Sequence, residues 1–353
     1  MRRGLMWVRR VVARILVPFM RARHGYWFVI RRRVVAISGL LAPDRDVVPA
    51  LHAVSVAECV RSTPAPRLVV PDPGYPVLEM PGGVVFGPWG EVGRGDGVVL
   101  ELGVRYGAAS DRWVLGDCDL ASAGPVHDLS GVTVNLVQRF ATNYAHWLFQ
   151  GLVRLEVLGR AIDLASCDRF LVPPSPPPFL AEVFERHGID WARAEPVAGY
   201  PASYRCELLV AAGMPQRPWE CPRWAMDSLR DRYGEPSADD GPRRVYLARG
   251  VGVRRGVVNE AELVAHLERR GFVTVSTIGR TIREQAALVG SAECIVAPLG
   301  AALGNLVFAP RTAHVIELAG RNFVRDTYRV VAATLGMPFT RLVGTEPGLP
   351  PWL

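Results

Sequence analysis

The sequence predicts an α/β protein whose two halves differ in pattern. Residues 65–140 are rich in glycine, proline and short apolar runs such as "GVVF" and "VTVNLV", a pattern typical of strands and turns. After residues 231–244, strand-like and helix-like segments alternate regularly. Such alternation specifies a parallel sheet with crossover helices. A chain of 353 residues is long enough for two domains of ordinary size.

Changes in composition divide the chain into four segments. Residues 231–244, "DRYGEPSADDGPRR", are polar and contain Gly, Pro, Ser and Asp, so they are the best candidate for a linker. That division gives a basic N-terminal segment (1–33), an N-terminal domain (34–230) and a C-terminal domain (245–353). The N-terminal domain ends as α/β, because "HWLFQGLVRLEVLGRAI" and "FLAEVFERHGI" predict helices and "RFLV" between them predicts a strand.

In the C-terminal domain the predicted strands are "RVYLAR", "FVTVST", "CIVAP", "AHVIEL" and "FTRLV". Helices are predicted to begin at Asn259, at Thr281 and near Arg325. Asn259 stands three residues before Glu262, and Thr281 three residues before Glu284. Each pair has the spacing of a capping box, in which the two side chains satisfy backbone N–H groups at the start of a helix.

The net charge of +7 is a local feature of the N-terminus. Residues 1–33 hold ten arginines and no acid, whereas the other 320 residues carry 31 basic and 34 acidic side chains, a net charge of −3. This distribution argues against a nucleic-acid-binding domain face. The N-terminal segment fits a basic amphipathic helix on an anionic membrane surface, and it fits a solvated extension equally well. It is too interrupted by charge to span a bilayer, and it lacks the features of a signal peptide.

Six cysteines show no C-x-x-C pair and no short regular spacing. They are expected to be buried or free thiols in a reducing cytoplasm, rather than a disulfide framework or a zinc site.

Two loops of the C-terminal domain favour the binding of an anion. Ligands of open α/β sheets sit outside the carboxyl ends of the strands, and "ARGVGVRRG" and "PLGAALGN" follow the first and third predicted strands. The first loop offers the guanidinium groups of Arg249, Arg254 and Arg255, which suit phosphate oxygens. The second exposes backbone amides at Gly300, Ala301, Ala302 and Gly304. Leu299 is expected to stand at the tip of this loop. The glycines of the first loop have the wrong spacing for a dinucleotide fingerprint.

In the N-terminal domain, "ATNYAHWLFQ" places Asn143, Tyr144 and His146 at the start of a helix. A histidine titrates near neutral pH and is a natural general base, although a histidine beside a tryptophan is more often structural, so both roles are open. Asp117 and Asp119 form a D-x-D motif of the kind that can hold a divalent cation, and they are interpreted as turn aspartates.

The run from "RRVYLARGVGVRRG" to "CIVAPLGAALGNLVFAPRTAHVIEL" resembles the signature half of glycosyltransferase family 61, the capsular polysaccharide biosynthesis protein family. "NYAHWLF" resembles the upstream motif of the same family. The resemblance covers roughly 200 residues, and the first 130 residues contain no matching motif. It implies a GT-B-like architecture with two Rossmann-like domains facing a cleft, to which the strand pattern of residues 65–140 adds a β-rich N-terminal part. It also implies a bacterial, inverting, metal-independent transfer from a nucleotide sugar, without any cofactor.

Residue roles follow from the resemblance by position. The donor site would be formed by Arg249, Arg254, Gly300, Ala301, Ala302, Asn305 and Glu317, with Arg254 reaching the diphosphate and Glu317 lying near the nucleoside. His146 would lie across the cleft as the catalytic base, with Asn143 and Tyr144 on the acceptor side. The acceptor would be a polysaccharide or a lipid-linked glycan in the cytoplasm, with the N-terminal segment holding the enzyme at the inner face of the cytoplasmic membrane.

Two departures from the family pattern keep other functions open. Leu299 occupies the position at which the family usually has histidine, and Gly304 occupies that of a usual threonine. The missing histidine leaves open a catalytically silent nucleotide-sugar-binding or assembly protein of the same fold.

A metal-dependent transferase that uses Asp117 and Asp119 is a third hypothesis, and it predicts that EDTA abolishes activity.

Overall fold

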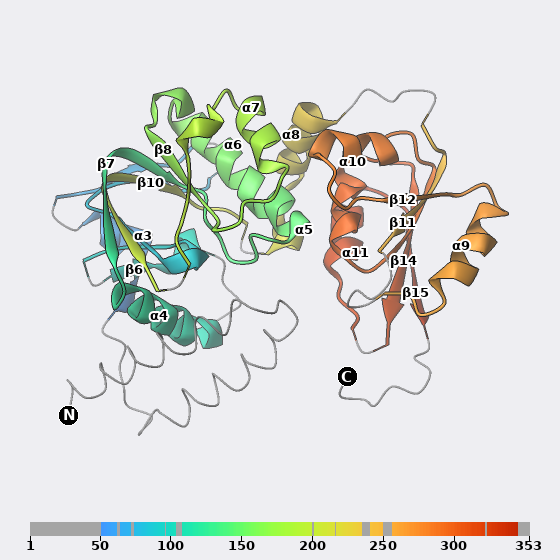
Figure 1. Cartoon of the computed structure of the whole chain (residues 1–353), viewed down its shortest axis with the longest axis horizontal. Helices are drawn as coiled ribbons and strands as arrows, with labels where there is room; N and C mark the ends of the chain where they lie inside the picture. Colours follow the sequence, from blue (N-terminus) through green and yellow to red (C-terminus); the bar gives the residue numbers. More distant parts are fainter. Residues whose placement is uncertain are drawn as a thin grey trace, which may run out of the picture.

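The computed structural model describes the chain from residue 51 onward. The described ranges are 51–61, 64–71, 74–95, 97–103, 108–199, 201–215, 217–234, 241–249, 256–321 and 323–344. The predicted basic N-terminal helix, Arg254 and Arg255 lie outside these ranges. Two sheets organise the described residues, and Figure 1 shows them at opposite ends of the molecule with helices between them.

The second sheet has the predicted α/β pattern. Its five strands are all parallel and run in the order β12-β11-β13-β14-β15. Their bounds are β11 (Arg244–Ala248), β12 (Val273–Ser276), β13 (Cys294–Pro298), β14 (His314–Gly320) and β15 (Phe339–Gly344). The chain order reverses between β11 and β13, which pair directly. Ligands of doubly wound sheets bind at the carboxyl ends of the strands flanking such a reversal.

Helices cover both faces of this sheet. Figure 1 shows α9 (Glu260–Glu268) on the outer face, and α10 (Ile282–Val289) and α11 (Thr327–Leu335) on the face turned toward the first sheet. Thr281 and Glu284 form the predicted capping box at the start of α10. The capping box predicted for Asn259 is wrong, because its amide donates to Glu262 Oε2 at 3.0 Å and its side chain makes no cap bond.

The first sheet is mixed and, within the described residues, has ten strands. The strands of this sheet are β1 (His52–Val54), β2 (Arg67–Val69), β3 (Val77–Pro81), β4 (Val84–Phe86), β5 (Glu91–Arg94), β6 (Gly97–Val99), β7 (Val126–Asn135), β8 (Arg169–Val172), β9 (Ala194–Pro196) and β10 (Ser203–Ala212). Strands β10, β7, β8 and β9 are parallel neighbours, whereas β3 and β4 pair with β10 in the antiparallel sense. The antiparallel pairs therefore involve β2 to β6 and one edge of β10, the parallel strands β7 to β10 form the α/β portion, and β1 pairs with β6 in the parallel sense.

The D-x-D motif does not lie in a turn, so its interpretation as a pair of turn aspartates is wrong. Asp117 and Asp119 belong to α4 (Ala108–Ser122). Asp117 accepts from Arg139 Nη1 at 3.0 Å, and Asp119 accepts from the Leu51 backbone N–H at 3.0 Å. Arg139 also donates to the buried Glu91 at 2.6 Å. The motif thus takes part in attaching α4 to the first sheet.

The predicted helix at residues 146–162 forms as three consecutive segments. These are α5 (Tyr144–His146), the π-helical turn η3 (Trp147–Gly151) and α6 (Leu152–Ala161). The predicted helix around "FLAEVFERHGI" is α7 (Leu180–Arg186), and α8 (Arg223–Tyr233) closes the first half of the chain. Single π-helical turns inserted into α-helices occur often at functional sites.

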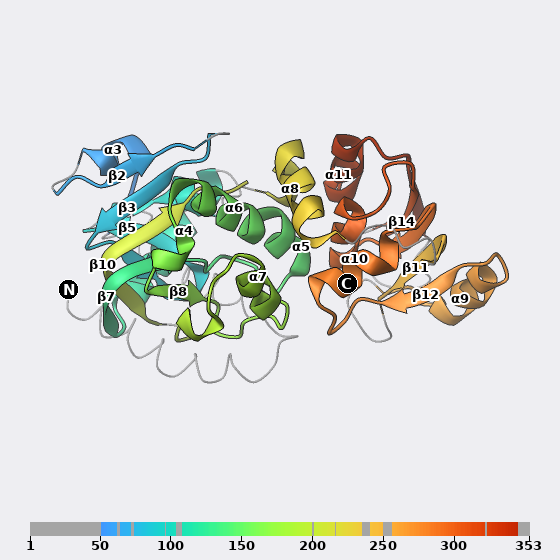
Figure 2. The same ribbon diagram turned by 90° about the horizontal axis from the view of Figure 1, so that it is seen from above.

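The two halves share an extensive polar and apolar contact. Figures 1 and 2 both show α5 and α8 beside the second sheet's helices. Arg230 of α8 donates to the Ala309 carbonyl at 2.6 Å, and Arg223 of α8 donates to the Thr334 carbonyl at 3.0 Å. Glu182 of α7 accepts from the backbone N–H groups of Ile282 (2.6 Å) and Arg283 (3.1 Å) at the start of α10. Contacts of this kind fix how the first half sits against the second.

All six cysteines are free, as predicted; five are buried and Cys294 is half-buried. Burial raises the pKa of the Cys167 and Cys206 thiols to about 11, so both remain protonated at neutral pH. Among the helices that the structure describes, none combines the length and the apolar character needed to cross a bilayer.

Candidate functional site

Arg249 and the backbone of residues 299–300 meet where the strand order of the second sheet reverses. Arg249 follows β11, and its Nη1 donates to the Leu299 carbonyl oxygen, which follows β13, at 2.8 Å. Gly300 adopts an extended backbone, and a Cβ atom placed there would lie 2.1 Å from Arg249 Nη1. The guanidinium therefore lies directly over the backbone of Gly300, in space that only a glycine leaves open.

The start of α9 helps to hold Arg249 in place. The Arg249 backbone N–H donates to Glu260 Oε1 at 3.3 Å, and the Tyr246 hydroxyl donates to the same oxygen at 2.8 Å. Tyr246 is fully buried in β11, so this carboxylate is tied to the core of the sheet. The position of the Arg249 backbone is thus set by the fold rather than by a ligand.

Leu299 does not stand at the tip of the loop. The residue is only 5% exposed, and its backbone N–H donates to the Leu318 carbonyl at 2.8 Å. The loop presents its backbone to Arg249 and turns the leucine side chain into the protein. Sequence alone could not reveal this, because the apolar side chain of a loop residue can point to either side.

Ala301 and Ala302 begin the 3₁₀ turn η7 (Ala301–Val307), and both are half-buried. The first N–H groups of such a turn have no acceptor within the turn itself, so they are available to an anion. Gly304, in the same turn, packs on the first half of the chain. A Cβ there would lie 3.1 Å from Leu148 Cδ1 and 3.5 Å from Ala145 Cβ. The glycine in place of a larger residue therefore permits close contact between η7 and α5.

Asn305 links the two halves through a buried hydrogen-bond network. Its Oδ1 accepts from the Tyr144 hydroxyl at 2.7 Å, and its Nδ2 donates to Gln285 Oε1 at 3.0 Å and to the Ala302 carbonyl at 3.1 Å. Asn305 is fully buried. Both ends of its amide are used inside the protein, so it supports the donor-side loop from behind and joins it to the helix that carries His146.

Asn305→Ala is expected to lower the free energy of unfolding by about 1–3 kcal/mol, because the Tyr144 hydroxyl loses its acceptor and Gln285 Oε1 loses its donor inside the protein. Asn259→Ala is the matched control: Asn259 is exposed and makes no helix-cap bond, so its loss should change stability by less than about 0.5 kcal/mol. Urea unfolding of both variants measures the difference. Equal effects of the two substitutions would contradict the role given to Asn305.

Glu317 lies inside the second sheet, at the level of Ala297 in the neighbouring strand. Its side chain is fully buried; Oε1 accepts from Arg341 Nε at 2.5 Å, and Oε2 has no hydrogen-bond partner among the described residues. Burial raises the pKa of this carboxyl, against the lowering effect of Arg341. Arg341 also bonds Asp326, in the loop after β14, at 3.0 Å. Glu317 therefore ties the middle of β14, through Arg341, to β15 and to the loop after β14.

His146 is oriented by a buried glutamine four residues along the same helix. His146 Nδ1 lies 2.5 Å from Gln150 Oε1, and Gln150 Nε2 donates to the Pro215 carbonyl at 2.9 Å. Because that second bond fixes the amide, its oxygen must face the histidine and accept the Nδ1 proton. Nε2 is then the basic nitrogen, and within the described part of the chain it has no hydrogen-bond partner.

The surroundings of His146 favour its neutral form. Its ring stacks on Phe140, with the ring centroids 4.8 Å apart, and desolvation by burial lowers its pKa below the usual 6.5, opposed by the bond to Gln150. Asn143 caps the helix, and its Oδ1 accepts from the backbone N–H groups of Ala145 (3.0 Å) and His146 (3.4 Å). The geometry and the protonation state both suit a base that accepts a proton at Nε2.

The structure thus brings the predicted residues together in two groups. Arg249, Gly300, Ala301 and Ala302 lie at the strand reversal of the second sheet, and Asn143, Tyr144 and His146 lie at the start of α5. The Tyr144–Asn305 bond joins the two groups. Five supporting residues were not predicted: Gln150, Tyr246, Glu260, Gln285 and Arg341. Of these residues, only Gln150 could have been found from the sequence, because it stands four positions after His146 on a predicted helix and such side chains are neighbours.

Within the described ranges, no group of three or more His, Cys, Asp or Glu side chains is arranged to hold a metal ion. Residues 144–316, which include α5, Arg249 and all of η7, match the model of the Glycosyltransferase 61 family. A search of curated proteins found no significant match.

Proposed function

We propose that this chain, which belongs to the Glycosyltransferase 61 family through residues 144–316, is an inverting glycosyltransferase that works without a metal ion. The family match indicates a glycosyltransferase. The donor would be a nucleotide sugar, and the acceptor a surface polysaccharide or its lipid-linked precursor. The observation that carries the proposal is the Arg249 guanidinium held over the bare backbone of Gly300 at the strand reversal.

The donor diphosphate is assigned to the loop formed by Arg249, Gly300, Ala301 and Ala302. A guanidinium and free backbone amides suit phosphate oxygens, and the reversal of strand order is where such sheets bind nucleotides. Arg254, outside the described residues, is proposed as a second phosphate contact, and the nucleoside is proposed to lie near Glu317. Asn305 would act behind this loop, through the hydrogen bonds that hold η7.

His146 is proposed as the general base, with Asn143 and Tyr144 on the acceptor side. Its Nε2 would take the proton of the acceptor hydroxyl while the hydroxyl oxygen attacks the anomeric carbon of the donor sugar. The bond between that carbon and the diphosphate oxygen breaks, and the nucleoside diphosphate leaves with the electron pair. Arg249 and the loop amides would stabilise the charge that grows on this leaving group, which is the task a metal ion performs in other transferases.

The location proposed for the enzyme is the bacterial cytoplasm. The basic segment at residues 1–33 would hold the chain at the inner face of the cytoplasmic membrane, near a lipid-linked acceptor. Anionic and neutral vesicles test this proposal, since co-sedimentation with anionic vesicles alone is expected at low salt and should be lost at high salt.

Leu299 favours a second candidate, a catalytically silent nucleotide-sugar-binding or assembly protein. Its buried side chain supplies no hydrogen-bond donor and no titratable group where the resembling family usually has histidine. The backbone and Arg249 can bind phosphate without it. The two candidates share the donor site and differ in turnover.

A thermal-shift screen of nucleoside diphosphates and nucleotide sugars in the presence of EDTA tests the donor site. A ligand at one hundred times its dissociation constant should stabilise the native state by about 2.7 kcal/mol. Arg249→Ala should abolish that stabilisation. If no member of the panel raises the melting temperature, or if Arg249→Ala leaves the shift intact, the donor site is elsewhere.

A further inference from the structure

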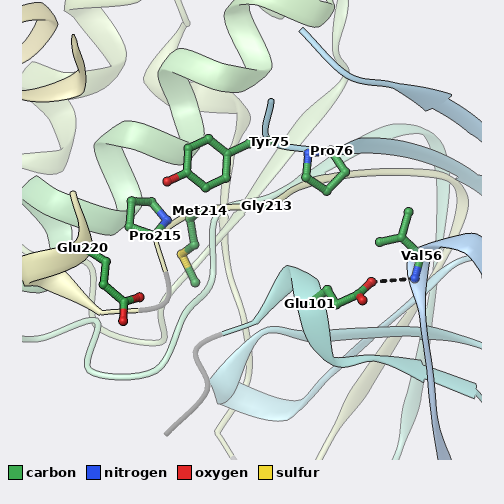
Figure 3. Close-up of a pocket in the computed structure, with 8 residues that line it drawn as sticks. All are labelled: Val56, Tyr75, Pro76, Glu101, Gly213, Met214, Pro215 and Glu220. Atoms are coloured by element: carbon green, nitrogen blue, oxygen red, sulfur yellow. Dashed lines mark hydrogen bonds between the residues drawn. The ribbon is translucent and has the colours of Figure 1, made fainter. Parts of the chain in front are cut away.

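A cavity of about 370 Å³ lies in the first half of the chain, on the side that carries His146. Ligand pockets of small molecules begin at about 300 Å³. Figure 3 shows the cavity with an apolar wall and one carboxylate at either side. Its lining residues are Val56, Tyr75, Pro76, Glu101, Gly213, Met214, Pro215 and Glu220.

The wall of this cavity is joined to His146 by hydrogen bonds. Pro215, which lines the cavity, accepts from Gln150 Nε2 through its carbonyl at 2.9 Å, and Gln150 Oε1 bonds His146 Nδ1 at 2.5 Å. The π-helical turn η3, which contains Gln150, also contacts the 3₁₀ turn η6 (Pro218–Glu220), which supplies Glu220. Pro215, which holds the glutamine that orients the base, therefore also forms part of the pocket wall.

The chemistry of the lining suits an uncharged ring that carries hydroxyl groups. Tyr75, Pro76, Met214 and Pro215 give a surface on which the C–H face of a sugar ring can pack. The carboxylates of Glu101 and Glu220 are acceptors that fit hydroxyl donors. Glu101 is positioned by the Val56 backbone N–H at 2.6 Å, and Glu220 lies 3.6 Å from Arg217 Nη1.

The same charges argue against an anionic occupant. Two carboxylates line the cavity, and no basic side chain is among its lining residues within the described part of the chain. A diphosphate or a sugar acid would meet the carboxylates of Glu101 and Glu220, and Arg217, 3.6 Å from Glu220, offsets part of that charge. Burial, together with the neighbouring Cys221 and Glu220, raises the pKa of the Tyr75 hydroxyl, so it stays a neutral donor that can also bond a sugar oxygen.

We propose that this pocket binds a neutral sugar ring of the acceptor, with Tyr75 as the packing surface and Glu220 as the hydroxyl acceptor. The inference rests on the proposed transferase function and adds to it the place and the class of the acceptor. The donor diphosphate site at Arg249 and the acceptor pocket at Tyr75 then lie on different halves of the chain, with the base on the helix between them.

The test uses saturation-transfer NMR on the full chain with methyl glycosides of neutral hexoses and pentoses, and with a methyl glucuronide as the anionic comparison. At least one neutral glycoside should bind, and the glucuronide should not. Glu220→Gln should weaken that binding by at least tenfold. Glu220 is exposed, so the fold should tolerate the change, and Glu268→Gln on exposed α9 is the matched control without effect. Tyr75→Leu, which removes the ring, should also weaken binding.

The results separate this proposal from the one it rests on. Suppose that a nucleotide raises the melting temperature but no neutral glycoside binds, or that glycoside binding is unchanged by both Glu220→Gln and Tyr75→Leu. The pocket assignment is then overturned and the donor site stands. If Glu220→Gln raises the KM for the nucleotide sugar instead of that for the acceptor, the pocket holds the donor sugar and the proposal is also wrong. If no nucleotide raises the melting temperature of the wild type, the donor site is overturned. The glycoside-binding results then still decide the pocket assignment.

Discussion

Gly300→Ala is expected to weaken nucleotide-sugar binding by about 10- to 100-fold, which corresponds to the loss of about one hydrogen bond to a charged group. The new Cβ would lie 2.1 Å from Arg249 Nη1 and 3.1 Å from Arg249 Cζ, so the guanidinium must move and give up its bond to the Leu299 carbonyl. The extended backbone of Gly300 is open to alanine, and the displaced group is the end of a flexible side chain. The fold should therefore survive while the donor site loses its cation.

Isothermal titration calorimetry with the nucleotide identified by thermal shift measures this effect, and urea unfolding checks stability. Gly116→Ala is the matched control, because a Cβ at that helical position meets no atom within 4 Å. In an Arg249→Ala background the Gly300→Ala change should have little further effect, since the group it displaces is already absent. Unchanged affinity in the Gly300→Ala variant would show that Arg249 does not bind the donor where it now lies.

His146→Ala is expected to reduce kcat by about 10²- to 10⁴-fold, the usual contribution of a general base, with a small effect on donor binding. The base must be neutral to accept a proton. Because burial lowers the His146 pKa, activity should persist at pH values somewhat below 6.5 and fall as the pH drops through the lowered pKa. The acid limb of the kcat/KM profile of the wild type locates that value.

Gln150→Glu is the diagnostic partner of this experiment. A carboxylate beside His146 Nδ1 would favour the charged imidazole and raise its pKa, so the acid limb should move to higher pH. Gln150→Leu removes the hydrogen bond that selects the His146 tautomer, so it should lower kcat without moving the acid limb of the profile to higher pH. A profile that is the same in wild type and Gln150→Glu, or an active His146→Ala variant, would contradict the role of His146.

The lowered pKa of His146 has a consequence for stability. As the pH falls through about 6.5, the unfolded chain takes up a proton at His146 before the folded chain does. Unfolding is therefore favoured progressively from about pH 6.5 down to the folded-state pKa, and the effect is complete below it. His146→Ala should remove this part of the pH dependence.

Much of the second sheet could be predicted from the sequence, because each element carries its own local signal. Five apolar runs became β11 to β15, and the Thr281–Glu284 spacing became a capping box. The same spacing failed at Asn259, whose amide bonds the Glu262 carboxylate instead of the backbone. A capping motif states which bonds are possible, and the local φ and ψ angles decide which one forms.

The hydrogen bonds that hold the site residues in place could not be predicted, because they join residues that are far apart in the chain. Tyr144 and Asn305 are separated by 161 positions, and nothing local indicates that their side chains meet. Leu299 is buried because its loop turns inward over the sheet, which only the tertiary structure decides. Asp117 and Asp119 follow an apolar run and are interpreted from the sequence as turn aspartates, yet both lie in α4 and bond distant partners, Arg139 and the Leu51 backbone.

The most direct test is transfer from radiolabelled nucleotide sugars by the purified full-length chain, in EDTA, to a panel of glycan and lipid-linked acceptors, with the anomeric configuration of the product read by NMR. An inverted glycosidic product, formed by the wild type and lost in His146→Ala and Arg249→Ala, is the expected result. Nucleotide-sugar binding without turnover across the whole panel would contradict a transferase and favour the silent binder. Retained configuration would contradict a single displacement with His146 as base, and turnover only after metal is restored would contradict the metal-independent mechanism.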